Sequence, residues 1–337
     1  MLCRVITFSF LLCVALAMAS GEAFAQYTRR AFEFVNLPAT ARTAGLGGVN
    51  ITQGYGRPGA AMENPALLAP RAAGHLSANY MGLVAGIRQG TAGYAVLRAD
   101  SGVWHVSVRY LDYGDFEGYD PAGQPTGTFQ ASDYAVTAAY SHQSGPFRAG
   151  LALSLLRSSI AGEGATGLAL DIGGVFQHPE QDLTAGLVFR NAGVIISDYS
   201  GADSRMPFDV QAGLSFRPAF MPFRFSITAH NLLVDNLVYV ESEGERPPFT
   251  ESIFRRLVFG TQIGLGKSVI LRAGYNHLLR KELRLEQAGG GAGFAYGIEV
   301  RAGLFTLAYS HLGYHAAGGG DHISLTANMQ TLAGKLF

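Results

Sequence analysis

Segments in which apolar and polar residues alternate recur along most of this chain, and this period of two constrains its fold more than any other feature. In "VWHVSVRY", residues 103–110, Trp104, Val106, Val108 and Tyr110 share one face, while His105, Ser107 and Arg109 share the other. Successive side chains of a β-strand point to opposite faces, so each such segment predicts a strand with one apolar and one polar face. Helical spacing is nearly absent after residue 72.

About fourteen strands are predicted in this way, each near the ~9–11 residues that a tilted membrane strand requires. Their approximate centres are Ala78, Tyr94, Val106, Val136, Leu151, Leu170, Leu187, Ala212, Ile227, Phe259, Leu271, Ile298, Leu307 and Leu325. An even strand number places both ends of a closed antiparallel sheet on the same side of a membrane.

The connections between these strands alternate in length. Short turns are expected at 99–102, 144–146, 178–181, 218–220, 264–267 and 302–303, and mostly long loops at 112–130, 193–206, 233–251, 279–291 and 313–321. Long extracellular loops and short periplasmic turns are typical of outer-membrane barrels. We therefore predict an all-β fold, a transmembrane antiparallel β-barrel of about 14 strands with lipid-facing apolar rows. A soluble all-β protein, with the apolar face in its core, is the alternative.

The N-terminus predicts export. Arg4 precedes an apolar run over residues 5–18 and a small-residue site at residues 23–25, a pattern typical of a secretory signal peptide over residues 1–25. An N-terminal membrane anchor is the alternative, but the run is short for a spanning helix. The chain has two cysteines, Cys3 and Cys13, and both lie in this segment, which argues against disulfides and thiol chemistry elsewhere.

Residues 26–71 lack the alternating pattern and are punctuated by glycine and proline, as in "AAMENPALLAP". Side chains fill the interior of an eight-stranded barrel but not that of a wider one. Small residues on the expected inward rows, Gly173, Gly186, Gly213, Gly274 and Gly297, would leave room for a plug. We therefore expect residues 26–71 to form a periplasmic segment or hatch and residues 72–337 to form the barrel. A loose periplasmic arm is the alternative.

Sequence signals for chemistry are weak. Lysine plus arginine and aspartate plus glutamate each total 25, so the charge balance does not indicate nucleic-acid binding. His311, His315 and His322 are better explained as interior or loop polar residues than as metal ligands. "GTQIGLGKS" and "GLSFR" each lack a glycine that the phosphate-binding loop and the nucleophile elbow require. We expect no catalytic residue, cofactor or metal, and hence no enzyme.

Two family resemblances extend these expectations. "NPALL" at residues 64–68, in a Gly-rich segment ahead of a barrel, resembles the hatch of FadL-like transporters, which implies that Asn64, Pro65 and Ala66 form the hatch motif. "FEFVNLPATARTAGLGGVN", "GYNHLLRKELRL" and "GGGDHISLTANM" resemble the PorQ family of the type IX secretion system. Residues 38–47 also share a pattern with the related PorV proteins.

The PorQ resemblance implies a non-enzymatic scaffold in the outer membrane. Such a barrel would anchor a PorZ-like surface protein beside a PorU-like sortase and a PorV-like shuttle, in the complex that processes and displays secreted cargo. The alternative is a FadL-like transporter of hydrophobic small molecules. The chemistry of the lumen separates the two: the polar inward rows favour the scaffold, whereas Phe32, Phe34 and Leu37 could build an apolar pocket.

Partner docking is expected on the long loops, because exposed aromatic and arginine side chains are common in protein interfaces. The candidate docking residues are Arg280, Lys281, Arg284, Tyr113, Phe116 and Tyr119. An aromatic girdle or a loop whose ion pairs satisfy one another explains the same residues.

Overall fold

Fourteen strands form one closed antiparallel barrel in the computed structural model, which describes residues 30–98, 102–234, 248–283, 291–315 and 318–336. The predicted signal peptide lies outside these residues. The strands are β1 (His75–Gly82), β2 (Arg88–Arg98), β3 (Gly102–Tyr119), β4 (Pro125–Ser144), β5 (Phe147–Ile160), β6 (Glu163–Gln177), β7 (Leu183–Ser197), β8 (Asp209–Phe216), β9 (Phe223–Ala229), β10 (Leu257–Leu265), β11 (Val269–Asn276), β12 (Phe294–Ala302), β13 (Phe305–His315) and β14 (Gly318–Asn328).

Short helices lie before, between and after these strands. They are η1 (Glu33–Asn36), α2 (Ala41–Gly45), η2 (Pro58–Met62), η3 (Pro65–Leu67), η4 (Pro70–Ala72), η5 (Val84–Gly86), α3 (Phe249–Phe254), α4 (His277–Glu282) and α5 (Met329–Leu336). Within the described residues, no helix has the length and hydropathy needed to cross a membrane.

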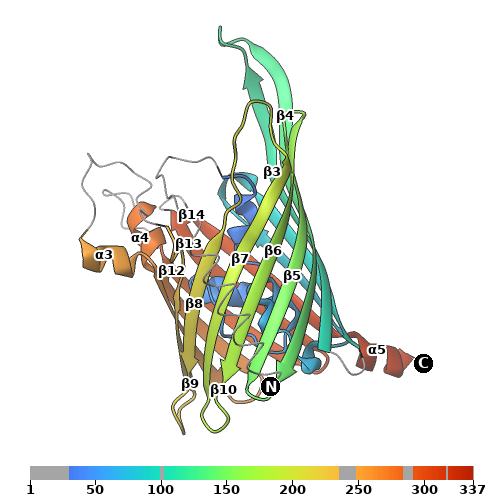
Figure 1. Cartoon of the computed structure of the whole chain (residues 1–337), viewed down its shortest axis with the longest axis vertical. Coiled ribbons are helices and arrows are strands. Elements are labelled where there is room, and N and C mark those ends of the chain that lie inside the picture. Colours follow the sequence, from blue (N-terminus) through green and yellow to red (C-terminus); the bar gives the residue numbers. More distant parts are fainter. Residues whose placement is uncertain (1–29, 99–101, 235–247, 284–290, 316–317, 337) are drawn as a thin grey trace, which may run out of the picture.

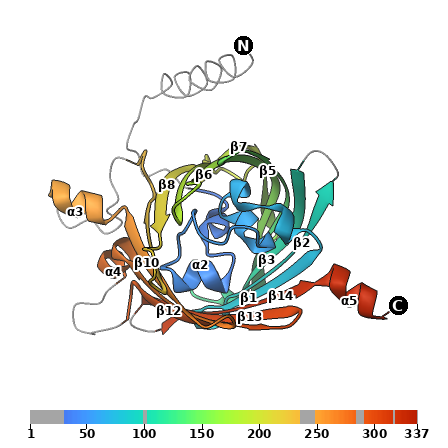
Figure 2. The ribbon, with the colours of Figure 1, turned by 90° about the horizontal axis from the view of Figure 1, so that it is seen from below.

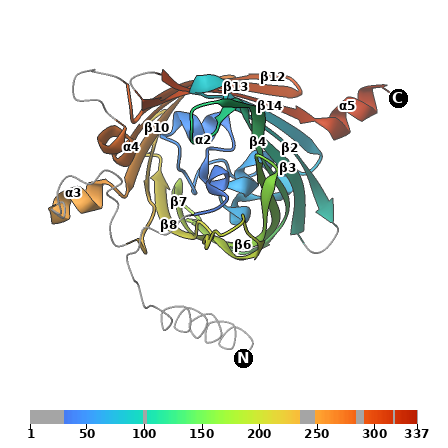
Figure 3. The same ribbon diagram turned by 90° about the horizontal axis from the view of Figure 1, so that it is seen from above.

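Each strand pairs with its neighbours in sequence, and β1 closes the barrel by pairing with β14, from His75 opposite Asn328 to Gly82 opposite Asp321. Figure 1 shows the tilted strands from the side, and Figures 2 and 3 look along the barrel from its two ends. Closure pairs every strand on both edges, so the sheet has no free edge. All fourteen predicted strand centres fall within observed strands.

The structure confirms which face of each strand points outward and which points to the interior. Val106 and Val108 are 54% and 47% exposed on the outer face, while Ser107 between them is 4% exposed and faces the interior. Large apolar side chains are exposed on every strand from β1 to β14, which an aqueous surface would disfavour but a lipid surface favours. The chain is an integral outer-membrane barrel.

Two of the predicted long loops are largely strand. Residues 112–130 form a hairpin in which β3 and β4 continue far beyond the rim, with Phe116 opposite Phe129 (Figure 1). Residues 313–321 are also mostly strand, because β13 continues to His315 and β14 starts at Gly318. Cross-strand pairing of aromatic and polar residues extends these ladders outside the apolar band, where alternation of hydrophobicity no longer marks a strand.

The last strand ends before the end of the chain. β14 stops at Asn328, and α5 then leaves the wall at the short-turn end, as Figures 1 and 2 show. Asn328 accepts a hydrogen bond from the backbone N–H of Thr331, and this contact satisfies a donor in the first turn of the helix. The absence of alternation after residue 329 therefore reflects a change from strand to helix.

The segment from Ala31 to Ala72 lies inside the barrel, and we call it the plug segment (Figures 2 and 3). It enters at the extracellular end, where the N–H of Ala31 donates to the carbonyl of Arg205 over 3.1 Å. It then passes through η1, α2, η2 and η3 and reaches the short-turn end at η4, ahead of β1. Most of its side chains are buried against inward-facing wall residues.

Candidate functional site

The Asn64, Pro65 and Ala66 motif forms a compact turn against the inner wall. The side-chain oxygen of Asn64 accepts from the N–H of Ala66 over 3.0 Å and so caps η3, while its Nδ2 donates to the carbonyl of Ile51 over 3.2 Å. All three motif residues are buried. The motif thus links η3 to the backbone at Ile51, and it packs against the barrel wall.

The wall opposite this motif is made of glycine. A Cβ at Gly150 would lie 2.4 Å from the carbonyl carbon of Pro65, and one at Gly173 would lie 2.0 Å from the Asn64 side-chain oxygen. Such separations are well below van der Waals contact, so only glycine permits this approach. Gly186, Gly213 and Gly274 also contact the plug segment, whereas Gly297 contacts Ser310 of the adjacent strand, contrary to our expectation.

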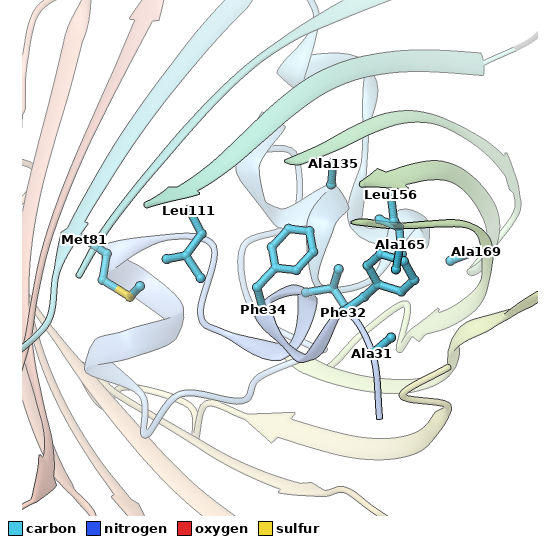
Figure 4. Close-up of a cluster of buried hydrophobic side chains, with 10 residues drawn as sticks. Ala31, Phe32, Phe34, Met81, Leu111, Ala135, Leu156, Ala165 and Ala169 are labelled. Carbon is cyan, nitrogen blue, oxygen red and sulfur yellow. The ribbon is translucent and has the colours of Figure 1, made fainter. Parts of the chain in front are cut away.

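An apolar cluster occupies the extracellular end of the interior. Phe32 and Phe34 of the plug segment pack there against Met81, Leu111 and Leu156, which point inward from β1, β3 and β5 (Figure 4). Ala31, Val35, Ala135, Ala165 and Ala169 complete the buried set, and Leu37 packs against it. The interior therefore has an apolar section that contains two phenylalanines directly below the extracellular loops.

Two buried arginines hold the plug segment beneath this cluster. Arg109 Nη1 donates to the carbonyls of Phe34 and Val35, both over 3.1 Å, and Arg190 Nη2 donates to the carbonyl of Val35 over 3.2 Å. Arg190 also lies 3.9 Å from the Glu63 carboxylate, which accepts from the N–H of Ala39. Hydrogen bonds to charged donors are stronger than neutral ones, so these contacts fix η1 while its aromatic side chains remain in the cluster.

The aromatic docking candidates have different environments. Tyr113 is partly buried, donates to Asp133 Oδ2 over 2.7 Å and packs against the apolar cluster, so it faces the interior. Phe116 stacks on Phe129 with ring centres 5.4 Å apart, and Tyr119 donates to Glu117 over 2.6 Å. Phe116 and Tyr119 are exposed on the projecting β3–β4 hairpin. The hairpin therefore presents two of the three aromatic residues to the outside.

The cationic docking candidates lie on or next to a helix. Lys281 of α4 lies 3.6 Å from the carboxylate of Glu251 in α3, and the guanidinium carbon of Arg280 lies 5.5 Å from the ring centre of Phe294. Arg284 lies outside the described residues. Lys281 therefore takes part in an ion pair between helices, as in the alternative of a loop whose ion pairs satisfy one another, and α4 occupies the start of the predicted loop at residues 279–291.

Within the described part of the chain, no group of three or more His, Cys, Asp or Glu side chains is arranged to hold a metal ion. His311 lies 2.9 Å from the Asp321 carboxylate, and His322 is buried. The side chain of His315 is not among those that the structure describes.

Sequence reasoning missed the partners of the buried charges. Arg109, Arg190 and Glu299 stand on the polar rows of β3, β7 and β12, so alternation already assigns them to the interior. Their partners are carbonyls and side chains up to 242 residues away in sequence, and no local pattern points to these pairs.

Comparison with known proteins shows the fold but no family. No family model matches the chain. No curated protein matches it either. Among solved structures, the Pseudomonas putida toluene transporter TodX has a TM-score of 0.53 at 12% identity, over 87% of this chain and 96% of its own. A TodX deltaS2S3 mutant, described as a monoaromatic hydrocarbon channel, gives 0.54 at 12% identity over 86% and 97%. A Pseudomonas aeruginosa FadL homologue gives 0.48 at 13% identity over 86% and 98%. The chain has a FadL-like outer-membrane barrel fold.

Proposed function

We propose that this protein is a non-enzymatic outer-membrane transporter of hydrophobic small molecules, in which the plug segment acts as a hatch. The carrying observation is the apolar cluster of Phe32, Phe34, Met81, Leu111 and Leu156 inside the extracellular end of the barrel. Binding sites for small molecules are concave, mostly apolar and rich in aromatic side chains. Movement of η1, which would break its hydrogen bonds to Arg109 and Arg190, would expose this cluster to a ligand that enters from the extracellular loops.

The arrangement of the hatch supports this proposal. Phe32 and Phe34 belong to the plug segment, whereas the other large members of the cluster belong to the wall. When the plug segment separates from the wall, the apolar surfaces of both lose their contact and become exposed to water. A hydrophobic ligand bound between them would bury these surfaces again. The likeness to a toluene transporter suggests toluene as the first probe.

Uptake of radiolabelled toluene by cells that express the chain tests the proposal. Expression should raise the initial uptake rate above that of vector-only cells, and Phe34→Ser should remove most of the increase. Phe116→Ser, the same exchange on the external hairpin, should leave uptake unchanged. Both variants must show the heat-modifiable mobility of a folded barrel. Uptake equal to that of vector-only cells would refute transport of this probe class.

A scaffold for a surface protein is a second candidate, favoured by the projecting β3–β4 hairpin with Phe116 and Tyr119 exposed. Exposed aromatic side chains on a rigid element lose little entropy when a partner binds. The PorQ resemblance suggests a PorZ-like surface protein, a PorU-like sortase and a PorV-like shuttle as partners. Pull-down from outer membranes would then lose the partner in Phe116→Ser and retain it in Phe34→Ser, the reverse of the pattern expected for uptake.

A further inference from the structure

Arginines converge at the short-turn end of the barrel interior. Arg42 and Arg57 come from the plug segment, Arg272 and Arg301 from β11 and β12, Arg71 from η4, and Arg148 from the start of β5. Arg148 follows the turn at residues 145–146, and Arg301 precedes the turn at residues 303–304, so both mark the periplasmic end. We call these six residues the arginine cluster.

One carboxylate, Glu299, serves four of these arginines among the residues that the structure describes. Its oxygens lie 2.6 Å from Arg272 Nη2, 3.1 Å from Arg301 Nε and 3.9 Å from Arg42 Nη2, and one of them accepts from Arg57. Glu299 is fully buried. A single negative charge cannot neutralise four guanidinium groups, so a positive surplus remains at this site.

Tyr55 organises the other two arginines. The guanidinium carbons of Arg71 and Arg148 each lie 4.2 Å from its ring centre, and Arg148 Nη2 donates to its hydroxyl over 2.7 Å. Gly56, next to Tyr55, has φ +70°, and a Cβ there would lie 2.0 Å from Arg71 Nε. The backbone at this turn is therefore shaped around an arginine side chain.

Donor groups in the cluster lack partners. Within the described residues, Nε and Nη1 of Arg272 and Nη1 of Arg148 are buried without a hydrogen bond, although these residues are only 4% and 5% exposed. Buried donors of this kind are rare in native proteins, because an ion, a water or a protein acceptor normally satisfies them. Partial desolvation, together with the positive charges of Arg57, Arg148 and Arg301, lowers the pKa of Arg71.

Space for small polar species adjoins the cluster. A cavity of about 30 Å³ is lined by Arg42, Arg57 and Glu299, and by the polar side chains of Thr40, Ser77, Asn79, Thr306, Ser324 and Thr326. This volume exceeds the roughly 10–15 Å³ that one water needs. On the periplasmic side Arg71 and Arg301 are exposed, so an anion larger than this cavity can reach the cluster from the periplasm.

We propose that the arginine cluster binds phosphate groups at the periplasmic mouth of the barrel. Guanidinium groups bind phosphate oxygens through paired N–H donors, and several guanidiniums around one anion give both charge and geometry. The group belongs either to a free phosphate compound or to a phospholipid headgroup. This site lies at the opposite end of the interior from the apolar cluster, and its function does not depend on the proposed transport.

Calorimetric titration of the full chain in a nonionic detergent with pyrophosphate at low ionic strength tests the site. The unaltered protein should bind, and Arg71→Gln should weaken binding at least tenfold. Arg217→Gln is the matched control. Arg217 lies at the same end of the barrel but forms an ion pair with Asp182, with 3.0 Å between Nε and Oδ2. Arg71 also donates to the carbonyl of Tyr55, so Arg71→Gln must show the heat-modifiable mobility of a folded barrel before its affinity is compared. Equal affinity of Arg71→Gln and the unaltered protein would place the anion elsewhere and overturn the proposal.

The same proteins in nanodiscs distinguish the two sources of phosphate. If a headgroup is bound, phosphatidylglycerol should raise the unfolding temperature relative to phosphatidylcholine, and this gain should disappear in Arg71→Gln. If a free anion is bound, pyrophosphate should raise the unfolding temperature equally in both lipids. Absence of any stabilisation by pyrophosphate or phosphatidylglycerol, with no calorimetric binding, would refute the site.

Discussion

Single glycines determine how closely the plug segment approaches the wall. In Gly173→Ala the new methyl group would meet the Asn64 side-chain oxygen at 2.0 Å and Pro65 Cδ at 3.1 Å. Forcing atoms into a packed interior costs about 1–3 kcal/mol. We expect Gly173→Ala to unfold at lower temperature in detergent and to make the plug segment more sensitive to protease.

The neighbouring residue provides the control for this prediction. A Cβ at Gly174 has no atom within 4 Å, so Gly174→Ala should behave like the unaltered protein. Equal behaviour of the two variants would show that the plug segment does not pack against β6 in this way.

Outward-facing residues at the centre of the lipid-facing apolar band should not tolerate replacement by a charged residue. Val106 is 54% exposed on the outer face of β3, and an arginine facing lipid at the midplane costs roughly 2–4 kcal/mol. Val106→Arg should lower the free energy of unfolding, measured by denaturant titration in lipid vesicles. Thr126→Arg, on the exposed hairpin that continues the same two strands, should have little effect, and a comparable loss there would contradict the assignment of the lipid band.

At the scale of elements, α3 and α4 are held together by charge. Glu251 of α3 lies 3.2 Å from His277, 3.3 Å from Arg255 and 3.6 Å from Lys281. Partial burial raises the pKa of Glu251, but the hydrogen bond and charge of His277 and the charges of Lys281 and Arg255 outweigh it and hold the pKa below its ordinary value of 4.5. The carboxylate therefore stabilises the contact between the helices only while it is ionised.

The sign of the pH dependence follows from this shift. A carboxylate with a lowered pKa in the folded state contributes stability above its ordinary value, and this contribution is lost as the pH falls through the folded-state pKa. Hydrogen exchange of α3 amides, corrected for intrinsic rates, should accelerate relative to β10 as the pH falls below 4.5. Glu251→Gln should exchange fast already near neutral pH, and an unchanged profile in that variant would exclude Glu251 as the cause.

At the scale of the whole molecule, the barrel orientation can be tested on cells. The only cysteines, Cys3 and Cys13, lie in the predicted signal peptide. An impermeant thiol reagent should label Tyr119→Cys on intact cells, because this residue is exposed on the long hairpin, but not Ser144→Cys, which lies at a short turn. Permeabilised cells should label both. Labelling of Ser144→Cys alone on intact cells would invert the topology.

The sequence by itself determined the barrel. Alternation, strand number and the outward or inward face of each strand are local properties, because a strand places side chains by a fixed period of two and lipid demands an apolar outer row. The same reasoning correctly placed Val106 outside and Arg109 inside. It failed for residues 112–130, where β3 and β4 continue into water and hydrophobicity no longer reports the strand.

Only the tertiary structure decided which wall side chains the plug segment meets. Phe34 meets Leu111, Asn64 meets Gly173, and Arg57 meets Glu299, and each pair joins the plug segment to a distant strand. These contacts depend on how the plug segment threads the closed barrel, and no spacing along the chain encodes that path. The apolar cluster and the arginine cluster therefore appear only when the barrel closes around residues 31–72, because closure brings side chains from many strands to one point.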